Sequence, residues 1–289
     1  MTRRDILTAV PTAFRTDGSL DLDGTRAIFR YVAQSGNEGA FVLGTTGEFP
    51  AVDDAEFDAI VGAAVEELAA HMRLVVHVGQ PSTFEAVRRL RAARDAGATE
   101  FAALTPYYLP ATEDAMFAYF EALSAEVGDG SLYVYIFPDR SGNPVTPELL
   151  ARLAALPGVV GAKVSGLGLD AIAAYRAAVP AEFIIYTGAD RELAAATEHG
   201  AQGVVSGVSS VLPRPFRELA VAADGGDADA IAQAQAVVDD VVEVIAGDMA
   251  RMKTAYRLLG VTDAACRMAI ADPTEADIAE IERVVAAHR

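Results

Sequence analysis

The stretch EFAALTPYYLPATEDAMFAYFEALSAEVGDGSLYVYI, residues 100–136, decides the fold. It contains two short apolar runs, Glu100–Leu104 and Leu132–Ile136, on either side of a helical segment, Thr112–Glu126. Runs that are apolar on both faces are typical of parallel strands covered by helices. Thr112 precedes acidic residues, as the capping residue of a helix does. The stretch therefore predicts a strand–helix–strand unit with two parallel strands.

The same alternation of short apolar runs and helical segments fills most of the chain. Six more strands are expected at Ile6–Val10, Gly39–Leu43, Leu74–Val78, Val159–Lys163, Phe183–Tyr186 and Gly203–Ser206. The clearest further helices are Asp21–Ser35, Asp53–Ala70, Thr83–Ala96 and Thr146–Ala155. Neither Gly-rich phosphate-loop pattern, G-x-G-x-x-G or G-x-x-x-x-G-K-[ST], is present, which argues against a doubly wound nucleotide-binding sheet. Eight strand–helix units predict an α/β protein, a (β/α)8 TIM barrel.

The chain continues beyond the eighth strand. Four segments there have helical spacing, about three more than a bare barrel needs: Pro213–Ala223, Asp227–Ala246, Asp248–Leu259 and Thr274–Ala287. We therefore expect a barrel over residues 1–223 and a C-terminal helical extension, residues 224–289, packed on it.

Composition excludes several classes of partner. The 289 residues carry 23 basic and 41 acidic side chains, a net charge of −18, which argues against binding to nucleic acid or to an anionic membrane surface. Uncharged apolar runs are too short for a membrane span. Met1–Asp5 leads into the first strand without a signal-peptide core, and Cys266 is the single cysteine, so we expect a cytoplasmic protein. The four histidines lack metal-ligand spacing, so no metal is expected.

Lysine is rare in this chain. Of the 23 basic residues, 21 are arginines, and the two lysines are Lys163 and Lys253. Lys163 ends the sixth expected strand, and barrel enzymes place their functional groups at the carboxyl ends of strands. Burial favours the neutral form of an amine, which attacks carbonyl carbons to form a Schiff base. We interpret Lys253, in the C-terminal helices, as structural.

Other polar groups lie at the expected strand ends, and each also has an ordinary structural interpretation. Gly44-Thr-Thr-Gly47 is typical of a tight turn, Tyr107, Tyr108 and Tyr135 of amphipathic packing, and Arg140 of a solvated loop. Together with a nucleophilic lysine they supply what Schiff-base chemistry needs: hydrogen-bond donors for a carboxylate, and a hydroxyl that moves protons.

Five ordered motifs give the chain a family resemblance from Ile6 through the C-terminal helices. They are Gly44-Thr-Thr-Gly-Glu48, Thr105-Pro-Tyr-Tyr108, Tyr135-Ile-Phe-Pro138, Gly161-Ala-Lys163 and Gly203-Val-Val-Ser206. In these motifs the chain resembles the dihydrodipicolinate synthase / N-acetylneuraminate lyase family.

The resemblance implies a role for each site residue. Lys163 forms a Schiff base with pyruvate or another 2-oxo acid. Tyr135 is the general acid and base, and Thr45 links it to Tyr108 of a neighbouring subunit. Thr45 and Thr46 bind the carboxylate of the 2-oxo acid. Gly44, Gly188 and Val205 contribute to the pocket around it. Arg140 holds a carboxylate of the second substrate, no cofactor is required, and the protein is a homo-oligomer, a dimer or a tetramer of tight dimers.

Two departures from the family pattern leave the second substrate open. Ile136 replaces the usual asparagine of the third motif, and Val164 stands where an acidic residue often follows the lysine. A dihydrodipicolinate-synthase-like condensation of pyruvate with a carboxylate-bearing aldehyde is expected. The alternatives are an aldolase or dehydratase acting on a 2-keto-3-deoxy sugar acid, and a non-catalytic protein that binds a 2-oxo acid.

Overall fold

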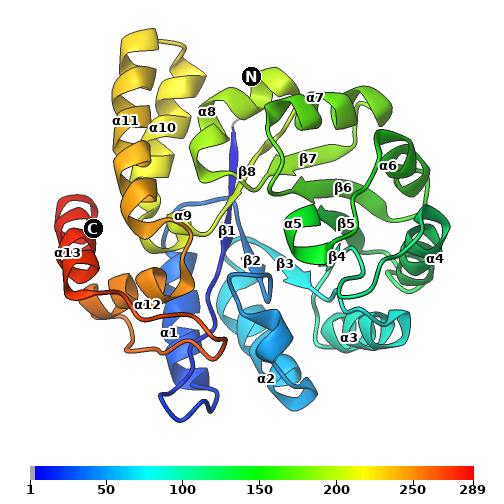
Figure 1. Ribbon diagram of the computed structural model, residues 1–289, viewed down its shortest axis with the longest axis horizontal. Helices are drawn as coiled ribbons and strands as arrows, with labels where there is room; N and C mark the ends of the chain where they lie inside the picture. Colours follow the sequence, from blue (N-terminus) through cyan, green and yellow to red (C-terminus); the bar gives the residue numbers. More distant parts are fainter. Residues whose placement is uncertain (1–3) are drawn as a thin grey trace. The chain divides into compact units, whose positions relative to one another are not determined.

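The computed structural model describes residues 4–289. Met1–Arg3, which belong to the start that was expected to lack a signal peptide, lie outside the described residues. Eight strands follow one another in a closed parallel barrel (Figure 1), which confirms the expected TIM barrel. The strands are β1 (Asp5–Ala9), β2 (Gly39–Val42), β3 (Arg73–His77), β4 (Glu100–Leu104), β5 (Ser131–Ile136), β6 (Val159–Val164), β7 (Ile184–Thr187) and β8 (Gly203–Ser206).

Helices follow the strands and continue beyond the last one. The longer helices are α1 (Leu22–Ala33), α2 (Asp54–Leu68), α3 (Thr83–Asp95), α4 (Glu113–Ser124), α6 (Pro147–Ala154), α7 (Leu169–Ala178), α10 (Pro213–Gly225), α11 (Ala228–Ile245), α12 (Met249–Leu258) and α13 (Glu275–His288). Three helices have four residues each, α5 (Pro138–Ser141), α8 (Leu193–Ala196) and α9 (Val208–Val211). Three 3-10 turns complete the set, η1 (Phe49–Ala51), η2 (Asp190–Glu192) and η3 (Thr197–His199).

The helices expected to begin at Asp53, Thr112 and Thr146 are present, and each of these residues caps its helix. The Asp53 carboxylate accepts a hydrogen bond from the Glu56 N–H, and the Glu56 side chain accepts one from the Asp53 N–H, a complete capping box. Thr112 and Thr146 cap α4 and α6 through their hydroxyl oxygens. The four-residue helices α5, α8 and α9 were not expected, because so short a segment has no measurable periodicity.

The chain divides into two compact units. The first comprises residues 1–74 and 205–289, and the second comprises residues 75–204. The C-terminal helices therefore group with the first strands of the barrel. The boundary expected at residue 223 stays a prediction.

In the first unit, β1 and β2 pair in parallel, with Thr8 opposite Ala40. Helices α1 and α2 pack against each other, and α9 contacts β1. The C-terminal part forms two helix pairs, α10 with α11 and α12 with α13 (Figure 1). Among the described residues, Glu48 and Lys253 form an ion pair with both side chains almost fully buried, at 0% and 1% exposure. This pair joins α12 to the loop that follows β2.

In the second unit, β4 to β7 form a continuous parallel ladder. Leu104 lies opposite Tyr135, Tyr135 opposite Lys163, and Lys163 opposite Tyr186. Helices α3, α4, α6 and α7 pack side by side in that order along the outside of these strands (Figure 1). The register places the expected general acid beside the expected nucleophile.

The buried pair generates a stability prediction. Replacing Lys253 with Met leaves the Glu48 carboxylate buried without its counterion, and we expect the free energy of unfolding in urea to fall by about 3–5 kcal/mol. The double variant Glu48→Gln/Lys253→Met buries no unpaired charge and should recover part of that loss. The control is Arg283→Met, which breaks a pair with Asp240 that is 46% and 44% exposed. It should cost no more than about 1 kcal/mol. Equal losses for Lys253→Met and Arg283→Met would contradict this prediction.

Candidate active site

The expected site residues fall into both units. Tyr108, Tyr135, Arg140, Lys163 and Gly188 belong to the second unit, and Gly44, Thr45, Thr46 and Val205 to the first. Each group is built from the ends of strands and the loops that follow them.

Lys163 and Tyr135 are neighbours on β6 and β5. They occupy the same register position of the parallel ladder, so their side chains leave the sheet on the same face. The Lys163 Nζ lies 4.2 Å from the centroid of the Tyr135 ring. Lys163 is 6% exposed and Tyr135 is 1% exposed. A buried amine in contact with a phenol is the arrangement that a lysine nucleophile and its proton shuttle require.

The strand positions beside this pair are apolar. Ile136 and Val164, the two departures from the family pattern, lie opposite each other and are both fully buried. Because side chains alternate along a strand, both leave the sheet on the face opposite to Tyr135 and Lys163. They belong to the apolar core on that face and do not border the amine directly.

Gly188 is required by the close approach of its loop to β6. Its N–H donates a hydrogen bond of 2.6 Å to the Val164 carbonyl. A Cβ at position 188 would lie 2.0 Å from the Ser165 Oγ and 3.0 Å from its Cβ, so a larger residue there requires Ser165 or the loop to move. The expected pocket residue Gly188 thus lies against the carboxyl end of the strand that carries Lys163.

His77 contacts Tyr135 and was missed by the sequence analysis. The two rings meet edge to face, with centroids 5.9 Å apart. The His77 Nε2 accepts a hydrogen bond from the Leu104 N–H at 3.1 Å, which requires this nitrogen to be unprotonated. His77 is the last residue of β3, and this place at a strand end is its only signal in the sequence, because it has no metal-ligand spacing to the other histidines.

Phe137 connects Tyr135 to Arg140. Its ring lies 6.2 Å from the Tyr135 ring, and the Arg140 guanidinium lies 5.6 Å from the Phe137 centroid. Arg140 is on the short helix α5 and is exposed. The guanidinium therefore remains accessible to a ligand while one face of it rests on an aromatic ring. Phe137 carried no signal in the sequence, because it is the variable position of its motif.

The loop after β4 presents Tyr108 to solvent. Tyr108 is 89% exposed and has a φ of 78°, an uncommon conformation for a bulky residue. The buried Asn143 holds this loop: its Nδ2 donates to the carbonyls of Pro106 and Leu109, and its Oδ1 accepts from the Ala111 N–H. Asn143 is a second residue that the sequence analysis missed. It has no local pattern, because its partners lie about 35 residues earlier.

Tyr107 in the same loop has a different environment. It is half-buried, and burial raises the pKa of its hydroxyl. Its hydroxyl donates to the Gln80 Oε1 at 3.5 Å. Tyr107 therefore stays a neutral phenol in the physiological pH range.

In the first unit, the loop after β2 forms the threonine turn, residues 43–48. The Gly47 N–H donates to the Gly44 carbonyl and the Glu48 N–H to the Thr45 carbonyl, both at 3.0 Å. A Cβ at Gly44 would lie 2.7 Å from the Phe41 ring, so glycine is needed there. Thr45 and Thr46 are half-buried.

Thr46 also lies near the end of β8. A Cβ at Gly207 would be 3.5 Å from the Thr46 Oγ1 and 3.4 Å from the Met252 side chain. Val205, two residues before Gly207, is buried in β8. The structure thus brings the threonine turn close to Gly207, directly after β8, the strand in which Val205 was expected to line the pocket.

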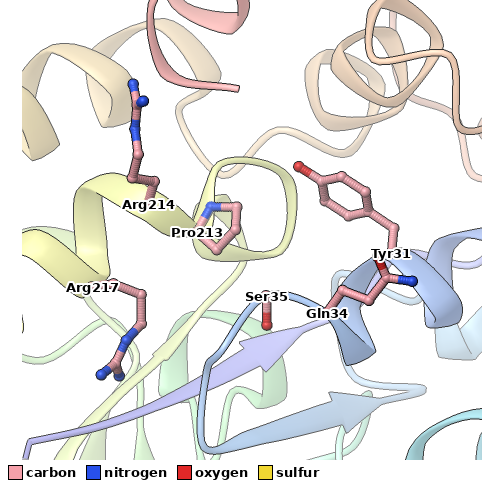
Figure 2. A pocket seen from close by; sticks show the side chains of 6 residues that line it. All are labelled: Tyr31, Gln34, Ser35, Pro213, Arg214 and Arg217. Atoms are coloured by element: carbon pink, nitrogen blue, oxygen red, sulfur yellow. The ribbon is translucent and has the colours of Figure 1, made fainter.

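One pocket is lined by none of these residues. A pocket of about 370 Å³ is lined by Tyr31, Gln34, Ser35, Pro213, Arg214 and Arg217 (Figure 2), none of them an expected site residue. The guanidinium groups of Arg214 and Arg217 point away from each other in this pocket (Figure 2). Residues 4–289 contain no cluster of three or more His, Cys, Asp or Glu side chains that could hold a metal ion. Over the same residues, no helix is long and apolar enough to span a membrane.

Comparison with known proteins identifies the family. Residues 2–288 match the Dihydrodipicolinate synthetase family. A 4-hydroxy-tetrahydrodipicolinate synthase of Dechloromonas aromatica is 33% identical over 221 residues, which are 76% of this chain and 75% of the relative. An uncharacterised DapA-like lyase of Halobacterium salinarum is 34% identical over 257 residues, 88% of this chain and 84% of the relative.

A solved structure agrees with these sequence relatives. The crystal structure of dihydrodipicolinate synthase from Thermotoga maritima superposes with a TM-score of 0.89 at 26% identity, and covers 100% of this chain and 99% of that chain. The chain belongs to the dihydrodipicolinate synthetase family, whose members are class I aldolase-type lyases and synthases.

Proposed function

We propose that this protein forms a Schiff base between Lys163 and pyruvate or another 2-oxo acid, and joins that acid to an aldehyde or cleaves the product. The observation that carries the proposal is the buried Lys163 amine, 4.2 Å from the centroid of the Tyr135 ring, in a chain of this family. The amine adds to the C2 carbonyl, and the carbinolamine loses water to give the imine. Loss of a C3 proton gives an enamine, whose C3 forms the new carbon–carbon bond with the aldehyde. Hydrolysis then returns the free lysine.

Tyr135 moves the protons in these steps. Its phenol lies next to the amine, and proton transfer is needed both when the carbinolamine loses water and when the imine is hydrolysed. We assign Thr45 and Tyr108 to the relay that connects this hydroxyl with solvent, as the family resemblance implies. The reaction needs no metal or organic cofactor, because the imine itself withdraws electrons from C3.

The carboxylate of the 2-oxo acid binds at the threonine turn. Thr45 and Thr46 supply hydroxyl donors to the carboxylate. We assign the backbone of Gly44, Gly188 and Val205 to the lining of the pocket, as the family resemblance implies. The half-buried state of both threonines supports this assignment, since each residue is partly shielded from solvent yet partly accessible.

The second substrate is an aldehyde that bears a carboxylate. The exposed guanidinium of Arg140 supports this assignment, since a fork of N–H donors suits a carboxylate. Ile136 stands where the family usually has an asparagine, and this departure leaves a second candidate open, cleavage or dehydration of a 2-keto-3-deoxy sugar acid.

The proposal includes the oligomeric state of the protein and its cellular location. The protein is a cytoplasmic homo-oligomer, a tetramer of tight dimers, in which Tyr108 acts in the site of a neighbouring subunit. The 89% exposure of Tyr108 and the 68% exposure of Leu109 support this, since both side chains are free to meet a partner.

Variants of the strand pair test the proposed chemistry. Lys163→Arg removes the nucleophile and should abolish turnover of pyruvate with any aldehyde. Tyr135→Phe should lower kcat by roughly 10²–10⁴-fold, since it removes general acid–base catalysis. Tyr133→Phe is the matched control: it changes a buried tyrosine on the same face of β5, two residues earlier, and should keep kcat within about twofold. Full activity of Lys163→Arg would refute the proposal.

A second set of variants tests the aldehyde class. Arg140→Gln should raise the KM of a carboxylate-bearing aldehyde by about tenfold and leave that of a neutral aldehyde unchanged, because one charge-assisted contact is lost. Arg152→Gln is the control, since this arginine also rests on an aromatic ring, 4.7 Å from the Phe117 centroid. It should change neither KM. Equal KM changes for both aldehydes in Arg140→Gln would contradict this assignment and favour the sugar-acid reaction.

In that case Ile136→Asn should shift the substrate preference of the enzyme toward the carboxylate-bearing aldehyde.

A further inference from the structure

The threonine turn has a strained backbone at both ends. Leu43 and Glu48, the residues that flank Gly44–Gly47, have φ values of 58° and 53°. The left-handed region is unfavourable for a side chain such as Leu43, and such conformations persist only where the surroundings impose them. Some contact outside the turn must therefore hold it.

The Glu48 side chain supplies that contact. Its Oε2 accepts hydrogen bonds from the backbone N–H groups of Arg267 and Met268, at 2.8 and 2.6 Å. Its Oε1 accepts a hydrogen bond from the Lys253 ammonium. All three donors come from the C-terminal part of the chain. Meanwhile the Glu48 N–H closes the turn onto the Thr45 carbonyl. A single residue thus joins the turn to α12 and to the segment 265–268.

The segment 265–268 is itself fixed in several ways. The Lys253 ammonium donates to the Ala265 carbonyl at 2.8 Å, and the Ala265 N–H donates to the Phe14 carbonyl. The Arg267 guanidinium binds the carbonyls of Gly18 and Ala51 and both oxygens of Glu56. It also lies 4.1 Å from the centroid of the Phe14 ring. The partners of the Glu48 carboxylate therefore cannot follow the turn if it moves.

We propose that Lys253 and the segment 265–268, together called the C-terminal clamp, grip Glu48 and thereby hold Thr45 and Thr46 in the geometry that binds the 2-oxo acid carboxylate. Glu48 and Lys253 are positioning residues, since their charged groups are buried against each other and not offered to the substrate. This inference rests on the proposed function of the threonine turn. It also gives the C-terminal helices a part in substrate binding.

The clamp predicts a specific kinetic change. Lys253→Met and the charge-neutral Glu48→Gln/Lys253→Met should each raise the KM of pyruvate by roughly tenfold, because the turn that binds the carboxylate loses its geometry. Displacement of Thr45 also weakens the proton relay, but kcat should fall less than in Tyr135→Phe, because Lys163 and Tyr135 are untouched. The double variant keeps the test usable if Lys253→Met does not fold, because it buries no unpaired charge. The control, Arg251→Gln, breaks contacts of another α12 side chain with Asp277 and the Val244 carbonyl, and should leave the KM unchanged.

Hydrogen–deuterium exchange of the peptide over residues 43–52 gives a readout independent of turnover. The amides of Gly47, Glu48 and Phe49 hydrogen-bond within the turn, and they should exchange at least about tenfold faster in the two clamp variants than in the wild type or in Arg251→Gln. Faster exchange together with the rise in KM supports the clamp.

The two readouts separate the clamp from the proposed function. If the wild type does not turn over pyruvate, the proposed function fails, and exchange alone decides whether the clamp holds the turn. An unchanged exchange rate in folded variants overturns the clamp. So does an unchanged KM in an active enzyme, because the pair would then serve stability alone.

Discussion

The hydrogen-bond register between β5 and β6 is the constraint on which the site depends. It sets Tyr135 opposite Lys163 in a parallel ladder, so that both side chains leave the sheet on one face. A shift by one residue would turn one of them to the other face and separate the amine from the phenol. The neighbouring strands extend the same arrangement, since Leu104 lies opposite Tyr135 and its N–H binds the His77 ring that packs on Tyr135. The proposed chemistry depends on this strand pairing, and the proposed substrate contacts lie in the loops.

The first unit shows a second constraint, which acts over a long distance in the sequence. The strained turn after β2 is attached to α12 through the buried pair of Glu48 and Lys253, 205 residues apart. Breaking such a pair is costly, because one charge is left buried. The helices beyond the eighth strand are therefore bonded to the loop that carries Thr45 and Thr46, and their presence in the chain has a physical reason beyond packing.

The sequence predicts the barrel well and the support of the site poorly. The eight strands were expected within about one residue of their ends, because parallel strands buried on both faces have a distinct apolar pattern. Lys163 was singled out because the chain has only two lysines and one of them ends a strand. In contrast, His77, Phe137 and Asn143 act through contacts between distant segments, which leave no local spacing to detect. Glu48 was identified only as the last residue of the motif Gly44-Thr-Thr-Gly-Glu48. The partners of its carboxylate become visible only in the fold.

The central claim is that Lys163 is the nucleophile, and borohydride trapping with pyruvate tests it most directly. The chain is suited to this measurement, because only two lysines are present and Lys253 is buried against Glu48. Intact mass followed by peptide mapping should show one reduced pyruvyl group per chain, on Lys163. An adduct on Lys253, or a folded protein that forms no adduct with pyruvate or with a 2-keto-3-deoxy sugar acid, would contradict the account.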